Sequence, residues 1–233
     1  MMDTAIDTLP GGQTGEGDRP ATIYELIRDD IVQGRLAPNT RLKVSALAEG
    51  YGTSTNPVRE ALQQLRGEGF VVITPNRGAR VRPMDDAFIR DVIEIELLLE
   101  PHFTRAFVDI ATNDDIERLE HLQLQIEVIG FADTVRYSAL DTQFHRIVYD
   151  RHYNQHALDI WWKHRDILGA LSRHTRFALW RGEAIIAEHR ELIACIKRHD
   201  ADGAAAVVAA HVRGSGKHLT EQIRAMRQEP LPG

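Results

Sequence analysis

The segment YGTSTNPVREALQQLRGEGF, residues 51–70, places a proline within a strongly helical pattern, and this combination fixes where the helix must begin. Apolar residues recur at three- and four-residue spacing after the proline, at Val58, Ala61, Leu62 and Leu65. Proline breaks a helix interior but is tolerated in the first turn, because its missing N–H would have no partner there. The helix therefore begins close to Pro57, with Ser54, Thr55 or Asn56 as its cap.

The start of this predicted helix gathers polar side chains and one arginine at an exposed end. These residues are Thr53, Ser54, Thr55, Asn56 and Arg59. The free N–H groups and the positive dipole of a helix N-terminus favour anions. This end of the helix is therefore suited to approaching a phosphate backbone.

The elements predicted around this helix follow the order of a winged helix-turn-helix. A helix over ATIYELIRDDIVQGRL ends at Gly34, a turn over LAPNTRL follows, and KVSALAEGYG indicates a second, shorter helix. After Gly69, the apolar run 71–73 and Val81 indicate two short strands joined by the turn TPNRGA. We therefore predict a winged helix-turn-helix over residues 19–82, preceded by a disordered tail over residues 1–18.

The charge of the chain is unevenly distributed. The formal net charge is −6, whereas residues 19–82 carry ten Lys and Arg against six Asp and Glu, a balance of +4. A basic segment on an otherwise acidic protein suggests a polyanionic partner. We expect double-stranded DNA, with the third helix in the major groove and the hairpin turn as a wing. The alternative at this point is a small helical domain with a capped helix and a solvated hairpin.

This segment resembles the N-terminal domain of the GntR family of bacterial transcription regulators. The resemblance rests on IYELIRDDIVQGRLAPNTRL, NPVREALQQLRGEGFV and PNRGARV, which occur in the family's order and spacing. It implies DNA contacts from the recognition helix and the wing, namely from Ser54, Thr55, Asn56, Arg59, Asn76, Arg77 and Gly78. The family often has an arginine where this chain has Thr55, and an acidic–basic pair where it has Val44 and Ser45. Because arginine can bind guanine through two hydrogen bonds, its loss implies a different base preference.

From residue 85 onward the sequence predicts helices only. The apolar spacing and the breaks between segments indicate about six, over residues 85–111 with a kink near Pro101, 113–130, 132–151, 154–179, 182–199 and 201–226. We therefore predict an all-α bundle over residues 85–228 that is long enough to enclose a pocket. The expected fold class is mainly α, with the winged helix-turn-helix followed by this bundle.

Three of these helices each carry a potential metal ligand on an apolar face. Asp141 and His145 are four residues apart, so they share one side of a helix. His189 lies in the middle of an isoleucine-rich stripe, and His211 shares a face with the valines of the last helix. Burying these polar groups is unfavourable unless something satisfies them, and one divalent cation bound by all four would do so. The alternative is that each histidine is a core residue bonded to backbone.

The segments LDTQFH, EHRELIACI and AAHV resemble the FCD effector domain of the FadR and VanR branches of the GntR family. In metal-containing members, one aspartate and three histidines hold the metal at the floor of the effector cavity, which implies the same role for Asp141, His145, His189 and His211. Six helices rather than seven favour the VanR-type branch. Glu96 stands where the family usually has an arginine facing the pocket. Small organic acids are the family's common effectors, and Glu96 would repel a carboxylate.

The sequence therefore predicts a homodimeric, ligand-responsive transcription regulator, a repressor that binds a palindromic operator. Its small-molecule effector would be held at a metal, for which Zn, Ni, Mn and Fe all suit a histidine-rich site. The main alternative is a metal-dependent hydrolase whose Asp/His₃ centre activates water. Against it, no further carboxylate stands out as a general base, and the basic first domain would be unexplained. A third reading is a structural metal without an effector.

Bulk features indicate a cytoplasmic protein without a membrane partner. No apolar run approaches the roughly 20 residues that cross a bilayer. The first 20 residues lack the basic start and apolar block of a secretory signal. The single cysteine, Cys195, excludes an internal disulfide and fits a reducing compartment. Its isoleucine neighbours indicate packing rather than a nucleophile.

Overall fold

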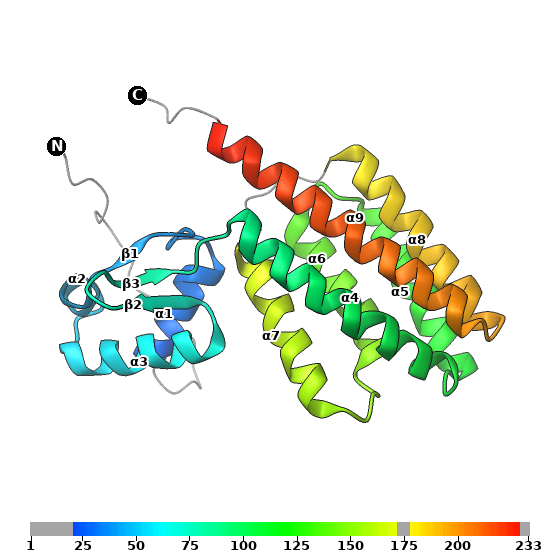
Figure 1. The fold of residues 1–233 in the computed structure, drawn as a ribbon, viewed down its shortest axis with the longest axis horizontal. Helices are drawn as coiled ribbons and strands as arrows, with labels where there is room; N and C mark the ends of the chain where they lie inside the picture. Colours follow the sequence, from blue (N-terminus) through cyan, green and yellow to red (C-terminus); the bar gives the residue numbers. More distant parts are fainter. Residues whose placement is uncertain (1–20, 172–177, 229–233) are drawn as a thin grey trace. The chain divides into compact units, whose positions relative to one another are not determined.

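The computed structural model describes residues 21–171 and 178–228, which form two compact units that divide between Arg82 and Pro83 (Figure 1). The first unit contains α1 (Ile23–Val32), β1 (Arg41–Leu42), α2 (Val44–Gly50), α3 (Thr55–Glu68), β2 (Val71–Thr74) and β3 (Gly78–Val81). The second contains α4 (Asp86–Val108), α5 (Asn113–Ile129), α6 (Thr134–Tyr149), α7 (Gln155–Leu171), α8 (Leu179–Lys197) and α9 (Ala201–Gln228). The predicted fold class, mainly α with a small winged unit first, is confirmed.

Helix α3 begins where the proline requires. Ser54 is its N-cap, and Pro57 lies within its first turn. The helix ends at Gly69, whose φ of 94° is in the left-handed region, and the N–H of Phe70 donates to the carbonyl of Leu65 at 3.0 Å. The apolar face predicted from the sequence is buried, at Val58, Ala61, Leu62 and Leu65. Packing of this face therefore leaves the opposite face of α3 exposed.

The sheet of the first unit is antiparallel, with the strand order β1–β3–β2. Strands β2 and β3 form the predicted hairpin, in which Thr74 faces Gly78 across the turn. The sequence interpretation missed β1, which lies in the segment expected to be a turn. A strand of two residues is too short to show the alternation of apolar and polar residues that predicts a strand. It forms because Leu42 pairs with Ala79 of β3.

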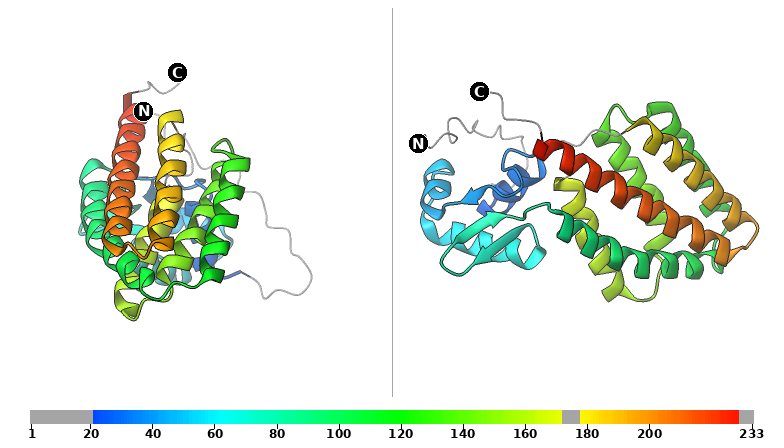
Figure 2. Two further views of the ribbon diagram at one scale, coloured as in Figure 1. Left: turned by 90° about the vertical axis from the view of Figure 1, so that its right-hand side faces the viewer. Right: turned by 45° about the horizontal axis from the view of Figure 1, so that its top comes forward.

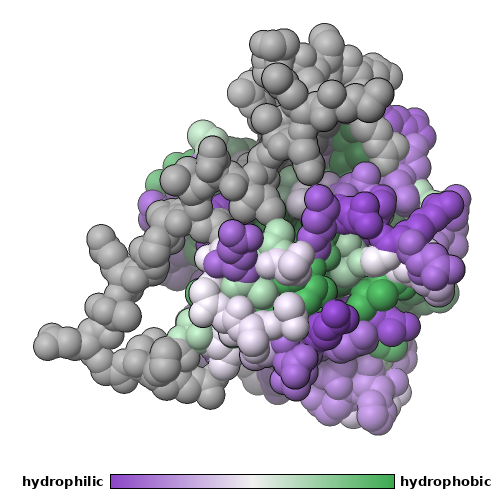
Figure 3. All heavy atoms as spheres, turned by 90° about the vertical axis from the view of Figure 1, so that its left-hand side faces the viewer, coloured by the Kyte–Doolittle hydropathy of each residue, from purple (hydrophilic) through white to green (hydrophobic). Residues whose placement is uncertain are grey.

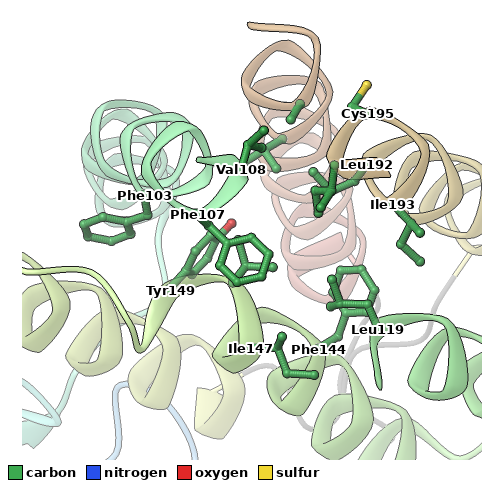
Figure 4. Packing of buried hydrophobic residues seen from close by; sticks show 14 of the residues in the cluster. Phe103, Phe107, Val108, Leu119, Phe144, Ile147, Tyr149, Leu192, Ile193 and Cys195 are labelled. Atoms are coloured by element: carbon green, nitrogen blue, oxygen red, sulfur yellow. The ribbon is translucent and has the colours of Figure 1, made fainter. Parts of the chain in front are cut away.

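The described part of the second unit consists of six helices and no strand, as predicted. Helices α8 and α9 lie side by side, and α9 also packs along α4 (Figures 1 and 2). Aromatic side chains from three helices meet in the core, where Phe103, Phe144 and Trp161 are fully buried. Figure 4 shows the neighbouring members of this cluster pointing toward one another from several helices. Cys195 is buried in the same cluster, as its sequence neighbours indicated.

The boundary predicted near Gly182, between the helices 154–179 and 182–199, is wrong, because α8 begins at Leu179 and continues through Gly182. A Cβ atom at this position would lie 2.5 Å from the ring of Phe131. The glycine therefore allows another segment to approach the helix closely, rather than ending it. Residues 172–177 of the predicted helix 154–179, and the predicted tail 1–18, lie outside the described residues.

Helix α4 continues through Pro101 as far as Val108. None of the helices in the described ranges combines the length and the apolar character required to span a membrane.

Candidate metal centre and DNA-binding surface

All four residues predicted as metal ligands come together in the second unit. Asp141 and His145 lie on α6, His189 on α8 and His211 on α9. All four are buried, and one potential ligand atom of each lies within 4.8 Å of those of the others. The Nε2 atoms of His189 and His145 are 3.6 Å and 3.8 Å from Oδ1 of Asp141. The sequence pattern thus identified a real spatial cluster able to hold a metal ion.

Two of these histidines have buried ring nitrogen atoms that make no hydrogen bond within the described part of the chain. Both ring nitrogens of His145 and Nε2 of His189 are buried without a hydrogen bond to any described residue. Burial holds the pKa of His145 well below its usual range. Burial and the neighbouring His211 lower the pKa of His189 to about 3. These imidazoles are therefore neutral near pH 7, and their lone pairs fit the requirements of a divalent cation.

Asp141 is held as a carboxylate by neighbours on two helices. Burial raises its pKa, but the positive charge of Arg165 on α7 lowers it well below the usual range. Arg165 pairs with Oδ2 of Asp141, while the hydroxyl of Tyr137 donates to Oδ1 at 3.0 Å. Because Oδ1 is the oxygen that faces His145 and His189, it is the candidate ligand atom.

His189 is oriented by two contacts from other helices. Its Nδ1 lies 3.0 Å from Oε1 of Gln123 on α5, so the Nδ1–H donates to this amide oxygen. The ring of Phe144 stacks on the imidazole, with 4.3 Å between centroids and 6° between planes. This tautomer leaves the lone pair on Nε2, which points toward Asp141.

His211 is oriented by a buried charge network. Its Nδ1 lies 2.8 Å from Oε2 of Glu188, and Arg181 donates to Oε1 of Glu188 at 3.0 Å. Arg181 is only 1 % exposed and also donates to the carbonyl of His211 and to the hydroxyl of Ser215. Burial raises the pKa of Glu188, but its bonds to His211 and Arg181 lower it to about 2. Glu188 is therefore a carboxylate that fixes the His211 ring.

The sequence interpretation did not identify these supporting residues. They are Gln123, Tyr137, Arg165, Arg181 and Glu188. Only Tyr137 left a usable signal, because it precedes Asp141 by four residues on the same helix. Arg181 and Glu188 are seven residues apart on α8, but their contacts with His211 run between helices, as do those of Gln123 and Arg165, so no spacing in the sequence relates them to the metal-ligand group.

Two further carboxylates are buried on α4. Glu100, 4 % exposed, accepts hydrogen bonds from the hydroxyl of Tyr149 at 2.9 Å and from Nε1 of Trp161 at 2.7 Å. Glu96, 7 % exposed, lies one turn earlier on the same helix. Burial and the neighbouring Glu100 raise the pKa of Glu96 to about 8, and burial raises that of Glu100. The departure from the family pattern at Glu96 is therefore an interior feature of the domain.

Gly214→Ala is expected to lower both stability and metal affinity. A Cβ atom at Gly214 would lie 2.6 Å from Nη1 of Arg181 and would displace the side chain that holds Glu188. We expect a loss of about 1–3 kcal/mol in the free energy of unfolding and about tenfold in zinc affinity. Urea unfolding and chelator competition measure the two effects. Gly169→Ala on α7, where a Cβ meets nothing within 4 Å, is the control. An equal effect at both glycines would contradict the role of Arg181.

The residues predicted to contact DNA are all exposed in the first unit. Ser54, Thr55, Asn56 and Arg59 surround the start of α3. Asn76 and Arg77 lie in the turn between β2 and β3, and Gly78 is the first residue of β3. Asn76 and Gly78 have positive φ angles of 61° and 77°, which shape this turn. Ser54 makes no side-chain cap bond to α3, so N–H groups of the first turn remain available to a ligand. Much of the surface in Figure 3 is hydrophilic.

A winged helix-turn-helix joined to a helical domain with a buried Asp/His cluster defines a class of DNA-binding regulators. Residues 20–81 match the family model described as bacterial regulatory proteins, gntR family, and residues 91–214 match that of the FCD domain. The chain belongs to the GntR family and carries an FCD domain. It is a transcription regulator rather than an enzyme, and the hydrolase alternative finds no support in these matches.

Relatives with both parts of the chain bear regulator names. The HTH-type transcriptional repressor RspR of Escherichia coli is 26 % identical over 212 residues, which cover 89 % of this chain and 90 % of that protein. The Nta operon transcriptional regulator of Aminobacter aminovorans is 27 % identical over 191 residues, 80 % and 88 % of the two chains. The solved structure of E. coli McbR/YncC is 22 % identical in sequence and superposes with a TM-score of 0.66. The match includes 86 % of this chain and 96 % of the McbR/YncC chain. This last likeness supports the fold.

Proposed function

We propose that the protein is a repressor that binds a palindromic operator as a homodimer and releases it in response to a small-molecule effector held at a metal. Residues 19–82 would bind DNA, and residues 85–228 would bind metal and effector, in the cytoplasm. The observation that carries this proposal is the group of four buried ligands with unused imidazole nitrogens. If these histidines were core residues that bind no metal, their nitrogen atoms would have no partners, which is unfavourable in a protein interior.

Each residue of the centre has a distinct task in this proposal. Asp141 and the three histidines would hold the cation, and Arg165 would keep Asp141 ionised and oriented. The bound metal would supply a positive centre with open positions for an oxygen atom of the effector. Gln123 and Glu188 fix the tautomers of His189 and His211, so the ligand atoms face the centre before the cation arrives.

In the first unit, the start of α3 would enter the major groove. Arg59 lies one turn into the helix, where its side chain can reach a base edge or a phosphate. Arg77 on the wing would approach the adjacent minor groove. Effector binding controls repression only if the effector and the operator favour different states of the protein.

The operator is tested by selecting genomic fragments with purified, metal-loaded protein at one fixed salt concentration. Salt is fixed because phosphate contacts dominate non-specific binding. We expect enrichment of an inverted repeat, bound by two copies of the chain in analytical ultracentrifugation. Enrichment of a single, unrepeated site or of no site would contradict the proposed operator.

Arg59→Ala is expected to weaken binding to the selected operator by about 1–3 kcal/mol, because it removes a charged contact at the start of the recognition helix. Fluorescence anisotropy with a labelled operator measures the change. Arg66→Ala is the matched control, because Arg66 is exposed near the other end of α3 and its loss removes the same charge. Equal affinities of the Arg59→Ala and wild-type proteins would refute the assignment.

A further inference from the structure

The two buried carboxylates of α4 differ in how they are satisfied. Glu100 accepts two hydrogen bonds, from Tyr149 and Trp161, so both of its oxygen atoms have a partner. Glu96 is nine-tenths buried, and no residue in the described part of the chain donates a hydrogen bond to it. The oxygen atoms of Glu96 are not among the fully enclosed side-chain atoms that lack a hydrogen bond, so they are open to a water molecule or a ligand.

Contacts among three helices place this pair beside the metal-ligand group. The rings of Tyr149 and Trp161, which hold Glu100, have centroids 5.5 Å and 6.4 Å from that of His145. Arg165 lies one turn beyond Trp161 on α7 and pairs with Asp141. Glu96 therefore lies one helical turn from Glu100, whose two hydrogen-bond donors are the aromatic side chains beside His145. It is also close enough to Arg165 to feel its charge.

Arg165 does not neutralise Glu96, since its hydrogen bonds go to the side chains of Asp141 and Thr142. A small molecule held at the metal would meet Glu96 as a carboxylate or as a neutral acid. An anionic group would be repelled by the first form, whereas an ammonium or a guanidinium group would bind that form and supply the missing donors. Because the pKa of Glu96 is raised to about 8, the free protein holds it mainly as the neutral acid near pH 7. A cation that pairs with Glu96 would displace this proton, and it is the ionised form of the position that favours a cation.

We infer that the effector carries a protonated amine or guanidine that pairs with Glu96, together with an oxygen group that binds the metal. This inference rests on the proposed function, because it assigns the chemical class of the effector at that same site. A dicarboxylic acid, the type of ligand that an arginine at this position would suit, is thereby disfavoured.

The test is isothermal titration of zinc-loaded, full-length protein with small chains of matched length. The probes are succinate, 4-aminobutyrate and 1,4-diaminobutane, with their five- and six-carbon homologues. We expect the amino acid of the series to bind at least about tenfold more tightly than the dicarboxylate of equal length, and more tightly than the diamine, which has no oxygen atom for the metal. In Glu96→Gln protein the preference should fall to within about twofold. Glu94→Gln, an exposed change on the same helix, should retain the preference.

Several results would overturn the inference: a dicarboxylate that binds as tightly as the amines, a preference that survives in Glu96→Gln, or no amine binding across the series. Zinc content and operator affinity are measured on the same preparations. Zinc binding combined with operator release by a dicarboxylate would leave the proposed function intact and remove only this inference. Absence of zinc binding would refute the metal site, while the Glu96→Gln comparison would still report on amine binding.

Discussion

His189→Ala protein is expected to bind zinc at least about a hundredfold more weakly than the wild-type protein. The substitution removes one of four donors and leaves Asp141 and two histidines to hold the cation. Competition with a chromophoric chelator measures the affinity, and mass spectrometry measures the metal content. His156→Ala, which removes an exposed histidine of α7, should bind zinc normally.

The same variant separates metal binding from folding. A ligand that binds only the folded state stabilises it, by about 2.7 kcal/mol at a concentration a hundred times its Kd. Adding zinc should therefore raise the Tm of the wild-type and His156→Ala proteins and change that of His189→Ala much less. Equal zinc content and equal thermal shifts in all three proteins would refute the ligand role of His189.

Glu96→Gln is expected to raise the free energy of unfolding of metal-free protein by about 2–4 kcal/mol at pH 9, and by less than about 1 kcal/mol at pH 5. The pKa of Glu96 is raised from 4.5 to about 8, chiefly by burial and by Glu100. Between these two values the folded state holds a proton that the unfolded state has released. Wild-type stability therefore falls as the pH rises through this window and stops falling above it.

Glutamine occupies nearly the same volume and cannot ionise, so the variant should lack this loss of stability. Urea unfolding at pH values from 5 to 9 measures the difference between the two profiles. Glu94→Gln is again the matched control, because Glu94 is exposed on the same helix and should leave the profile unchanged. Parallel profiles for the wild type and Glu96→Gln would show that Glu96 does not carry a raised pKa.

The sequence predicted the four clustered residues because each stands on a strongly patterned helix. Asp141 and His145 were related by their four-residue spacing, and His189 and His211 by the apolar residues on either side of them. Such patterns show which face of a helix is buried, and the burial of these faces is confirmed. They do not show which faces meet, so the contacts of Gln123 and Arg165 with the ligand group could not be predicted from the sequence.

The missed features of the fold have the same physical origin. Strand β1 forms because it pairs with β3. The glycine at position 182 lies inside a helix because the ring of Phe131 occupies the space that a Cβ atom would need. Glycine is a reliable helix terminator only where no neighbour needs the space of its missing Cβ. The proline at position 57 was more informative, because its covalent geometry restricts the helix whatever packs against it.

The arrangement of the four ligands also bears on how the chain is cross-linked. With a single cysteine, the protein cannot form an internal disulfide. A cation shared by Asp141 and His211 would close a loop of about 70 residues, for which the chain-entropy model of a cross-link gives about 4 kcal/mol. The metal would thus act as a reversible cross-link between α6 and the α8–α9 pair. Without the cation this constraint would be absent, so the stability of the contacts between these helices would depend on the supply of the metal.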